Sequence, residues 1–142
     1  MSASRAGNGD LPGAVTEYGR AIALEPGNAG YWARRCWMQA RLGRDLDAAL
    51  DDCQRALALQ PDGEHLMGAR GFVYLVRKDY AAAIADYDAE LRLVPPDAYA
   101  FFGRGLAKMR LGASGPGRAD LATAAAIDPT VAAAFASWGF RP

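Results

Sequence analysis

The chain has 142 residues, of which 51% are hydrophobic and 23% are charged, as is typical of a single globular domain with a sizeable core. Sixteen basic residues balance sixteen acidic ones, so no whole-chain field favours nucleic acid or anionic lipid as a partner. No apolar run approaches the roughly 18 residues of a membrane span, and the start lacks the apolar region of a signal peptide. We therefore expect a cytoplasmic protein, or a periplasmic one if a signal peptide was removed.

Helical spacing of apolar residues recurs along the whole chain, interrupted by prolines at nearly constant intervals. Pro26, Pro61, Pro95 and Pro129 are separated by 35, 34 and 34 residues. Proline ends helices, so each one marks the close of a unit. In chain order, the predicted helices cover 12–25, 29–42, 46–60, 64–77, 80–93, 97–111, 116–127 and a short segment after Pro129.

Small and large residues recur in the same register. A small residue stands 12 positions before each proline, and a second small series falls in the first half of each period. A large apolar series accompanies them. Small residues at helical spacing allow two helices to approach closely, and large ones fill the space between pairs. A period of this length indicates stacked two-helix units. The three series are Ala14, Ala49, Ala83 and Gly117; Cys36, Gly71 and Gly105; and Trp32, Met67, Phe101 and Phe135.

The pattern resembles the tetratricopeptide repeat, and the resemblance extends from about Gly9 to the C-terminus. The residues that carry it are Trp32, Cys36, Ala49, Cys53, Ala56 and Pro61 in one unit, Gly71, Tyr74, Ala83, Tyr87 and Pro95 in the next, and Phe101, Gly105, Leu111, Gly112, Ala124 and Pro129 in the third. The resemblance implies an all-α fold: a right-handed superhelix of antiparallel helix pairs with a concave groove. About three full repeats are expected, with half repeats at both ends.

We divide the chain as one domain, 1–142. The second helix of a truncated first repeat covers 9–28, three repeats cover 29–62, 63–96 and 97–130, and a capping helix covers 131–142. Glu90 stands where the family has alanine, which predicts looser packing there. The cap should turn Phe135 and Trp138 inward over the last pair.

At the other end, hardly any first helix precedes the predicted turn at Gly9 and Asp10. Val15, Tyr18 and Ile22 should then lack part of their cover. Two interpretations stay open. The chain is a fragment of a longer array, or this edge pairs with another copy.

A ladder of arginine–carboxylate pairs is predicted between helices. Each arginine precedes a small-series residue, and each acid precedes the position held by Tyr18, Cys53, Tyr87 or Leu121. A buried arginine needs such a partner, so this structural role is preferred to an anion-binding row. The pairing offset stays open. We assign this role to Arg35, Asp52, Arg70, Asp86, Arg104 and Asp120, with Glu17 as a further acid. Trp32, from the large apolar series, is a further structural residue.

Cys36 and Cys53 should face each other within one helix pair, close enough for a disulfide. Free buried thiols are the preferred interpretation for a reducing compartment. A metal site would need more ligands, and the only histidine, His65, lies on another unit.

The resemblance places the first helix of each pair on the concave face. The floor is then aromatic and aliphatic with arginines near its edge, and aromatic and arginine side chains often anchor interfaces. We expect partial exposure of the aromatic residues. The predicted groove residues are Arg34, Trp37, Arg41, His65, Phe72, Val76, Tyr99, Phe102, Leu106 and Arg110. Lys78 and Lys108 lie off this face, which argues against a lysine-based clamp for chaperone tails.

These features predict a non-catalytic protein-interaction module that binds a partner's peptide in its groove as a scaffold or adaptor. The peptide would present apolar side chains, with an acidic residue near Arg41 or Arg110. No catalytic constellation, cofactor or metal is expected. The alternative is self-assembly through the N-terminal edge. The Ala, Gly and Arg content suggests a GC-rich bacterial source.

Overall fold

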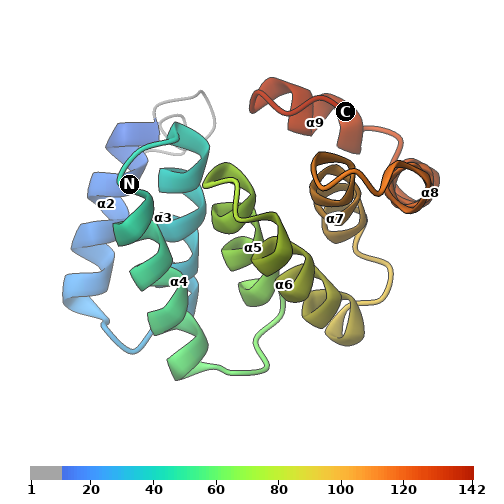
Figure 1. Ribbon diagram of the computed structural model, residues 1–142. Helices are drawn as coiled ribbons and strands as arrows, with labels where there is room; N and C mark the ends of the chain where they lie inside the picture. Colours follow the sequence, from blue (N-terminus) through green and yellow to red (C-terminus); the bar gives the residue numbers. More distant parts are fainter. Residues whose placement is uncertain (1–10) are drawn as a thin grey trace.

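The computed structural model describes residues 11–142 and places them in helices joined by short turns. Three complete antiparallel pairs stack in sequence, with a single helix before them and a short one after (Figure 1). The described part of the chain is therefore an α-solenoid, as the repeat period predicts. In chain order the helices are α2 (Leu11–Leu24), α3 (Ala29–Leu42), α4 (Leu46–Leu59), α5 (Leu66–Val76), α6 (Tyr80–Leu93), α7 (Ala98–Arg110), α8 (Ser114–Ile127) and α9 (Val131–Ser137).

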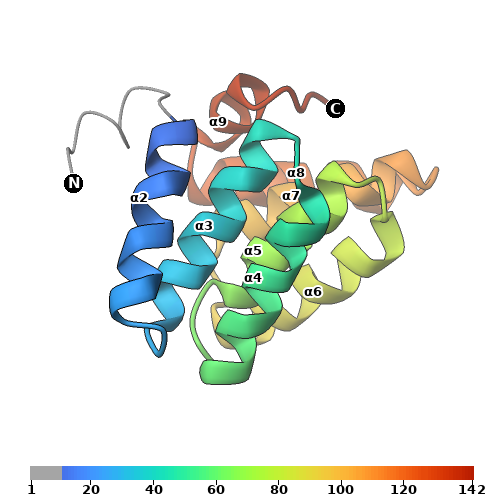
Figure 2. The same ribbon diagram turned by 90° about the vertical axis from the view of Figure 1, so that its left-hand side faces the viewer.

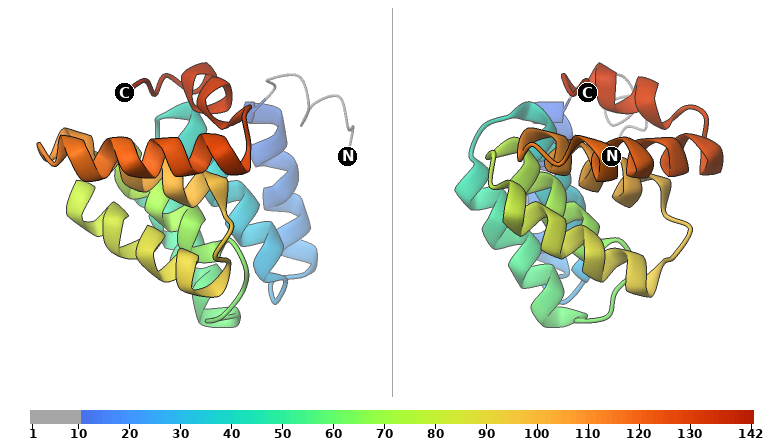
Figure 3. Two further views of the ribbon diagram at one scale, coloured as in Figure 1. Left: turned by 90° about the vertical axis from the view of Figure 1, so that its right-hand side faces the viewer. Right: turned by 45° about the vertical axis from the view of Figure 1, so that its right-hand side comes forward.

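The pairs are α3 with α4, α5 with α6, and α7 with α8, and each pair packs on the next. The direction of the helices changes steadily from α2 to α8, so that α8 runs across the line of α2 (Figure 2, Figure 3). One continuous core joins the three pairs, from Cys36 on α3 to Phe135 on α9.

Local chemistry sets the helix boundaries. Asn28 caps α3 by accepting a hydrogen bond from the Tyr31 amide, and Asp97 caps α7 by accepting from Tyr99 and Ala100. Such caps satisfy amide groups that have no partner inside the helix. At the other end of α3, Gly43 has a φ of 71°, the left-handed conformation that closes many helices.

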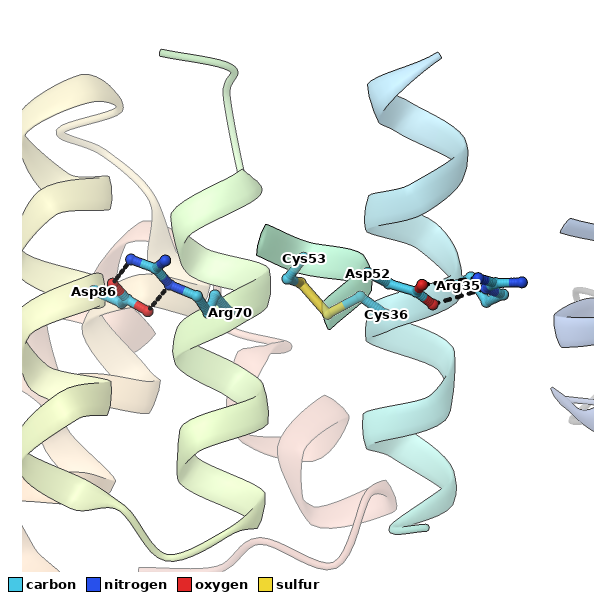
Figure 4. The surroundings of a disulfide bond; sticks show 6 residues. All are labelled: Arg35, Cys36, Asp52, Cys53, Arg70 and Asp86. Atoms are coloured by element: carbon cyan, nitrogen blue, oxygen red, sulfur yellow. Dashed lines mark hydrogen bonds and ion pairs between the residues drawn. A yellow bond between two sulfur atoms is a disulfide. The ribbon is translucent and has the colours of Figure 1, made fainter. Parts of the chain in front are cut away.

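A disulfide joins Cys36 of α3 to Cys53 of α4 (Figure 4). Both residues are fully buried, and their Cα atoms lie 5.5 Å apart. The expectation of free thiols is therefore wrong, although the predicted proximity is correct. Two small residues at the closest approach of a helix pair bring the sulfur atoms within bonding reach.

The N-terminal helix is better covered than the sequence suggests. Tyr18 and Ile22 are 6% and 7% exposed, and Val15 is half-buried. Tyr18 and Val15 belong to a cluster that includes Tyr31 and Met38 of α3. The expectation that this face lacks cover is wrong for Tyr18 and Ile22. The predicted turn at 9–10 lies outside the described residues.

Glu90 also departs from expectation. Its side chain is fully buried, and it lies against Gly68 of α5, where a Cβ atom would come within 3.3 Å of the Glu90 carboxyl carbon. The larger residue on α6 is thus matched by a missing side chain on α5. Packing here is tight, not loose.

Candidate functional site

The concave side of the solenoid contains a pocket of about 530 Å³ between α3, α5, α7 and the C-terminal segment. Its walls are mainly apolar and aromatic, with charged groups at the margin. Pockets of this size and character are typical of ligand sites. The lining residues are Gly30, Ala33, Arg34, Trp37, Met38, Glu64, His65, Leu66, Gly68, Ala69, Phe72, Tyr87, Asp97, Tyr99, Ala100, Phe135 and Trp138.

The C-terminal segment forms one wall of this pocket. Helix α9 packs on α7 and α8 (Figure 1), and its Phe135 ring lies 4.7 Å from the ring of Phe102, centre to centre. Trp138 follows the helix, and its ring lies 5.2 Å from Trp37 and 5.6 Å from Phe72. The inward turn of both residues was predicted, but they reach beyond the last pair to α3 and α5.

This contact corrects the predicted groove floor. Phe72 and Phe102 are only 2% and 3% exposed, so the expectation of partial exposure is wrong for these two aromatic residues. Leu106, also predicted to line the groove, is 1% exposed. The aromatic rings of Phe135 and Trp138 cover Phe72, and Phe135 also covers Phe102. A single large side chain can remove an aromatic ring from water in this way, which favours packing over exposure.

The other predicted groove residues divide into two sets. Arg34, Trp37, His65 and Tyr99, together with the buried Phe72, line the pocket. Tyr99 is 44% exposed, and Trp37 is half-buried. The remaining five lie outside the pocket lining. They are Arg41, Val76, Phe102, Leu106 and Arg110.

Arg41 has an unusual environment beside the pocket. Its guanidinium carbon lies 4.7 Å from the centre of the Trp37 ring and 5.3 Å from that of Trp138, within cation–π range of both. Burial lowers the pKa of Arg41 below its ordinary value, and its Nε is buried without a hydrogen-bond partner. A buried donor of this kind is costly to leave unpaired. Arg41 is therefore equipped to bind an additional acceptor.

A cluster of polar side chains lies at the other end of the pocket. Glu90 accepts hydrogen bonds from the backbone amides of His65 and Gly68 at the start of α5. His65 Nδ1 lies 3.1 Å from Glu90 Oε2 and 3.2 Å from Asp97 Oδ2. Burial, and next the neighbouring Asp97, raise the pKa of Glu90 to about 7. The cluster thus links the second and third helix pairs.

The sequence reasoning missed Glu90 and Asp97 as members of this site. A signal was available, because Asn28 and Asp97 stand two residues after a repeat proline, where the second unit has Gly63. A unit without its own cap needs a cap from elsewhere. His65, Glu90 and Asp97 are also a group that could hold a metal ion. However, both carboxylates already accept hydrogen bonds from helix N-termini, so we assign no metal to them.

The arginine ladder is present, and its offset is now defined. Each arginine binds the aspartate of its own pair through two hydrogen bonds of 2.7–2.9 Å (Figure 4 shows two of the pairs). Arg104 also binds Asp88 of the preceding pair at 2.8 Å. These arginines are committed to the structure, which leaves them unsuited to an anion-binding row. The three pairs are Arg35–Asp52, Arg70–Asp86 and Arg104–Asp120.

Two further residues lie at or beside the positions of the ladder. Trp32 donates from Nε1 to the Pro26 carbonyl at 2.9 Å and lies beneath the guanidinium groups of Arg35 and Arg55. Glu17 is the acid of the first, incomplete unit, and its Oε2 is buried without a hydrogen-bond partner.

Two comparisons with known proteins agree with this architecture, although no family model matches the chain. Human tetratricopeptide repeat protein 13 is 34% identical over 102 residues, which cover 67% of this chain and 12% of that protein. Small glutamine-rich tetratricopeptide repeat-containing protein 2 of Mycosarcoma maydis is 26% identical over 115 residues, which cover 81% of this chain and 32% of that protein. The chain thus spans less than a third of the length of either relative.

The crystal structure of MamA supports the same fold. It matches 98% of this chain and 86% of its own, with a TM-score of 0.73 and 16% sequence identity. A second MamA structure covers 98% of this chain with a TM-score of 0.57. At this identity the likeness concerns the fold alone.

Stacked helix pairs with a repeat of 34 or 35 residues define a helical-repeat protein. The register of the repeat residues and the relatives above make the assignment specific: the chain is a tetratricopeptide repeat protein. A repeat scaffold of this kind is typical of protein-interaction modules, and proteins with this fold are typically non-catalytic. Within residues 11–142, no helix is long and apolar enough to cross a membrane.

Proposed function

We propose that the chain is a non-catalytic scaffold or adaptor that binds a peptide segment of a partner protein in the pocket between α3, α5 and α7. The observation that carries this proposal is the pocket itself, about 530 Å³ with aromatic walls. The exposed face of Tyr99 and the half-buried ring of Trp37 offer apolar contact. Arg34 at the margin offers a hydrogen-bonding cation. These residue types are the ones that dominate binding energy at interfaces.

A library of displayed peptides, selected on the full chain, tests the proposal. A selected peptide should bind the variant Arg34→Ala/Tyr99→Ala at least tenfold more weakly than it binds the wild type. This loss corresponds to about 1.4 kcal/mol of binding free energy. The matched control is Arg118→Ala/Leu111→Ala, which removes an exposed arginine and a 56% exposed apolar side chain outside the pocket. Equal affinity for the pocket variant and the control, with both folded, would place binding elsewhere.

Self-assembly through the N-terminal edge is a second candidate. Two observations favour it: Leu24 is 84% exposed at the end of α2, and Glu17 Oε2 is buried without a hydrogen-bond partner. A second copy could supply a donor and an apolar side chain to this edge. Light scattering on the full chain across a range of concentrations tests this candidate, and a monomer throughout would contradict it.

The cellular setting and the partner class are also proposals. The balanced charge supports protein partners over nucleic acid. The disulfide is typical of an oxidising compartment, so it favours the periplasmic alternative over the cytoplasm. Free-thiol titration of protein extracted under trapping conditions would distinguish the two.

A further inference from the structure

The chain leaves its last helix at Ser137 and folds back over the concave side. Gly139 has a φ of 90°, a conformation that suits glycine, and it reverses the direction of the backbone. The amide of Phe140 then donates to the Phe135 carbonyl at 2.9 Å. This turn directs the side chains of Trp138 and Phe140 toward the helices that line the groove.

Trp138 lies in a seat made of residues from three helices. Its ring centre is 5.2 Å from that of Trp37, 5.6 Å from that of Phe72 and 6.2 Å from that of Tyr99. Arg41 lies over the same ring at 5.3 Å. Trp37, Phe72 and Tyr99 also line the pocket, so a side chain of the protein itself occupies the position that the aromatic side chain of a ligand would take.

This segment is held less firmly than the helix before it. Phe135 is 1% exposed, whereas Trp138 and Phe140 are only half-buried. Beyond the local turn, the polar contact that holds residues 138–142 is one hydrogen bond from Arg110 Nη2 to the Arg141 carbonyl, at 3.0 Å. Segments whose side chains stay partly exposed, and which few polar contacts hold, open at a lower cost in free energy than a fully buried helix face. Helix α9 can therefore stay in place while the segment after it moves.

One hydrogen-bond donor beside the seat of Trp138 has no acceptor. Arg41 Nε is buried and lacks an acceptor, although the guanidinium lies within cation–π range of both tryptophan rings. A ligand that brings a carbonyl or carboxylate oxygen beside its aromatic side chain would satisfy this donor, which residues 138–142 do not. Such a ligand would therefore have an advantage over the chain's own segment.

We propose that the groove recognises a partner segment of the type Trp-x-Phe, which takes the seat of Trp138 and Phe140 and displaces residues 138–142. The proposal rests on the proposed function and names the chemical class of its ligand. A large aromatic side chain supplies the contact area, and Arg41 holds it by stacking. The resident segment then acts as a competitor that only a matching sequence overcomes.

The test uses an N-acetylated, fluorescently labelled peptide with the sequence FASWGFRP, which corresponds to residues 135–142, and a second peptide with alanine in place of its tryptophan. Binding is measured by fluorescence anisotropy to the full chain and to its variant Trp138→Ala/Phe140→Ala. The variant Trp138→Ala/Phe140→Ala, called the vacated variant below, should bind FASWGFRP, the tryptophan peptide, at least tenfold more tightly than the wild-type chain does. The alanine peptide should bind at least tenfold more weakly to the vacated variant.

Two controls make the result specific. Leu111→Ala/Ile127→Ala removes two exposed apolar side chains on other surfaces and should behave as the wild type. Circular dichroism checks that the vacated variant is folded. If its helical signal falls, the single change Trp138→Ala, which keeps Phe140, replaces it.

Several outcomes would overturn the inference. The first is that the tryptophan peptide does not bind the vacated variant, and the second is that the two peptides bind it equally. The third is that the wild type forms dimers by exchanging residues 138–142, and that Trp138→Ala abolishes these dimers. If a library peptide without tryptophan binds the pocket while the tryptophan peptide does not, the inference fails and the proposed function stands. If no peptide of either kind binds, both fail.

Discussion

The first and second complete helix pairs fill the same repeat positions in different ways. Where α3 and α4 approach most closely, Cys36 and Cys53 are joined by a disulfide. Where α5 and α6 approach, the Gly71 backbone lies against the ring of Tyr87, so that a Cβ atom at Gly71 would come within 3.3 Å of it. One pair is held by a covalent bond between two small residues, and the other by a large side chain packed against glycine.

The starts of these pairs differ in the same way. Asn28 caps α3 from its own position in the chain, whereas α5 has Gly63 there and depends on Glu90 of α6. At the corresponding place on α4 the residue is Ala56. The comparison shows that the repeat framework fixes which positions are in contact. The residue types at each contact can change, provided that a change on one helix is matched by a change on the other.

Removal of the disulfide should have the largest effect on this comparison. Cys36→Ser/Cys53→Ser should lower the free energy of unfolding by about 3 kcal/mol, because the link spans 17 residues and restricts the unfolded chain. Chemical denaturation of the wild type with and without reductant, beside this variant, measures the effect. A variant that matches the oxidised wild type in stability would show that the bond is not formed in solution.

Overfilling the contact between the second and third pairs should have the next largest effect. A Cβ atom at Gly103 of α7 would overlap the ring of Tyr87, which is 2% exposed and packed in the core. Gly103→Ala should therefore cost about 2 to 3 kcal/mol of folding stability. Gly27→Ala is the matched control, since Gly27 is exposed, has no other part of the chain within 4 Å of an added Cβ and has no positive φ, and it should be neutral or stabilising. Thermal melts compare the two, and equal melting temperatures would contradict the packing around Tyr87.

The cap supplied by Glu90 should give the smallest effect, and one that depends on pH. Its pKa is raised to about 7 in the folded protein from the ordinary value of 4.5, so the folded state binds the proton more tightly. This contribution to stability is present below pH 4.5 and is lost as pH rises toward 7, by up to about 2 kcal/mol between pH 5 and pH 7.

Glu90→Gln, which keeps an acceptor oxygen and removes the charge, should abolish that part of the pH dependence. Urea denaturation at pH 5 and pH 7 measures it. The exposed Glu64→Gln serves as the control and should retain the wild-type profile. If the pH profile of the Glu90 variant also matches the wild type, the raised pKa does not belong to this residue.

The parts of the fold that could be predicted from sequence are those whose residue pattern recurs in several repeats. Prolines and the series of small residues locate the helices to within about two residues. The recurring acids identify the set that pairs with Arg35, Arg70 and Arg104, but the structure was needed to assign each acid to its arginine. The exposure of Phe72 could not be predicted, because it depends on contacts with Phe135, Trp138 and Phe140, which lie far from it in the sequence. The role of Glu90 was missed because a repeat period aligns equivalent positions of successive units. It does not show which residues of two different helices lie in contact.

The polar links between pairs are unequal. Between the second and third pairs, Arg104 binds Asp88 at 2.8 Å and His65 lies 3.2 Å from Asp97, whose side chain is 8% exposed. Between the first and second pairs, the ion pair is Arg77 with Asp47 at 3.4 Å, and the Asp47 side chain is 94% exposed. Exposed ion pairs contribute little. Seen as a row of units coupled to their neighbours, the protein has its weaker polar link between the first two pairs, where the disulfide that locks α3 to α4 does not reach across to α5.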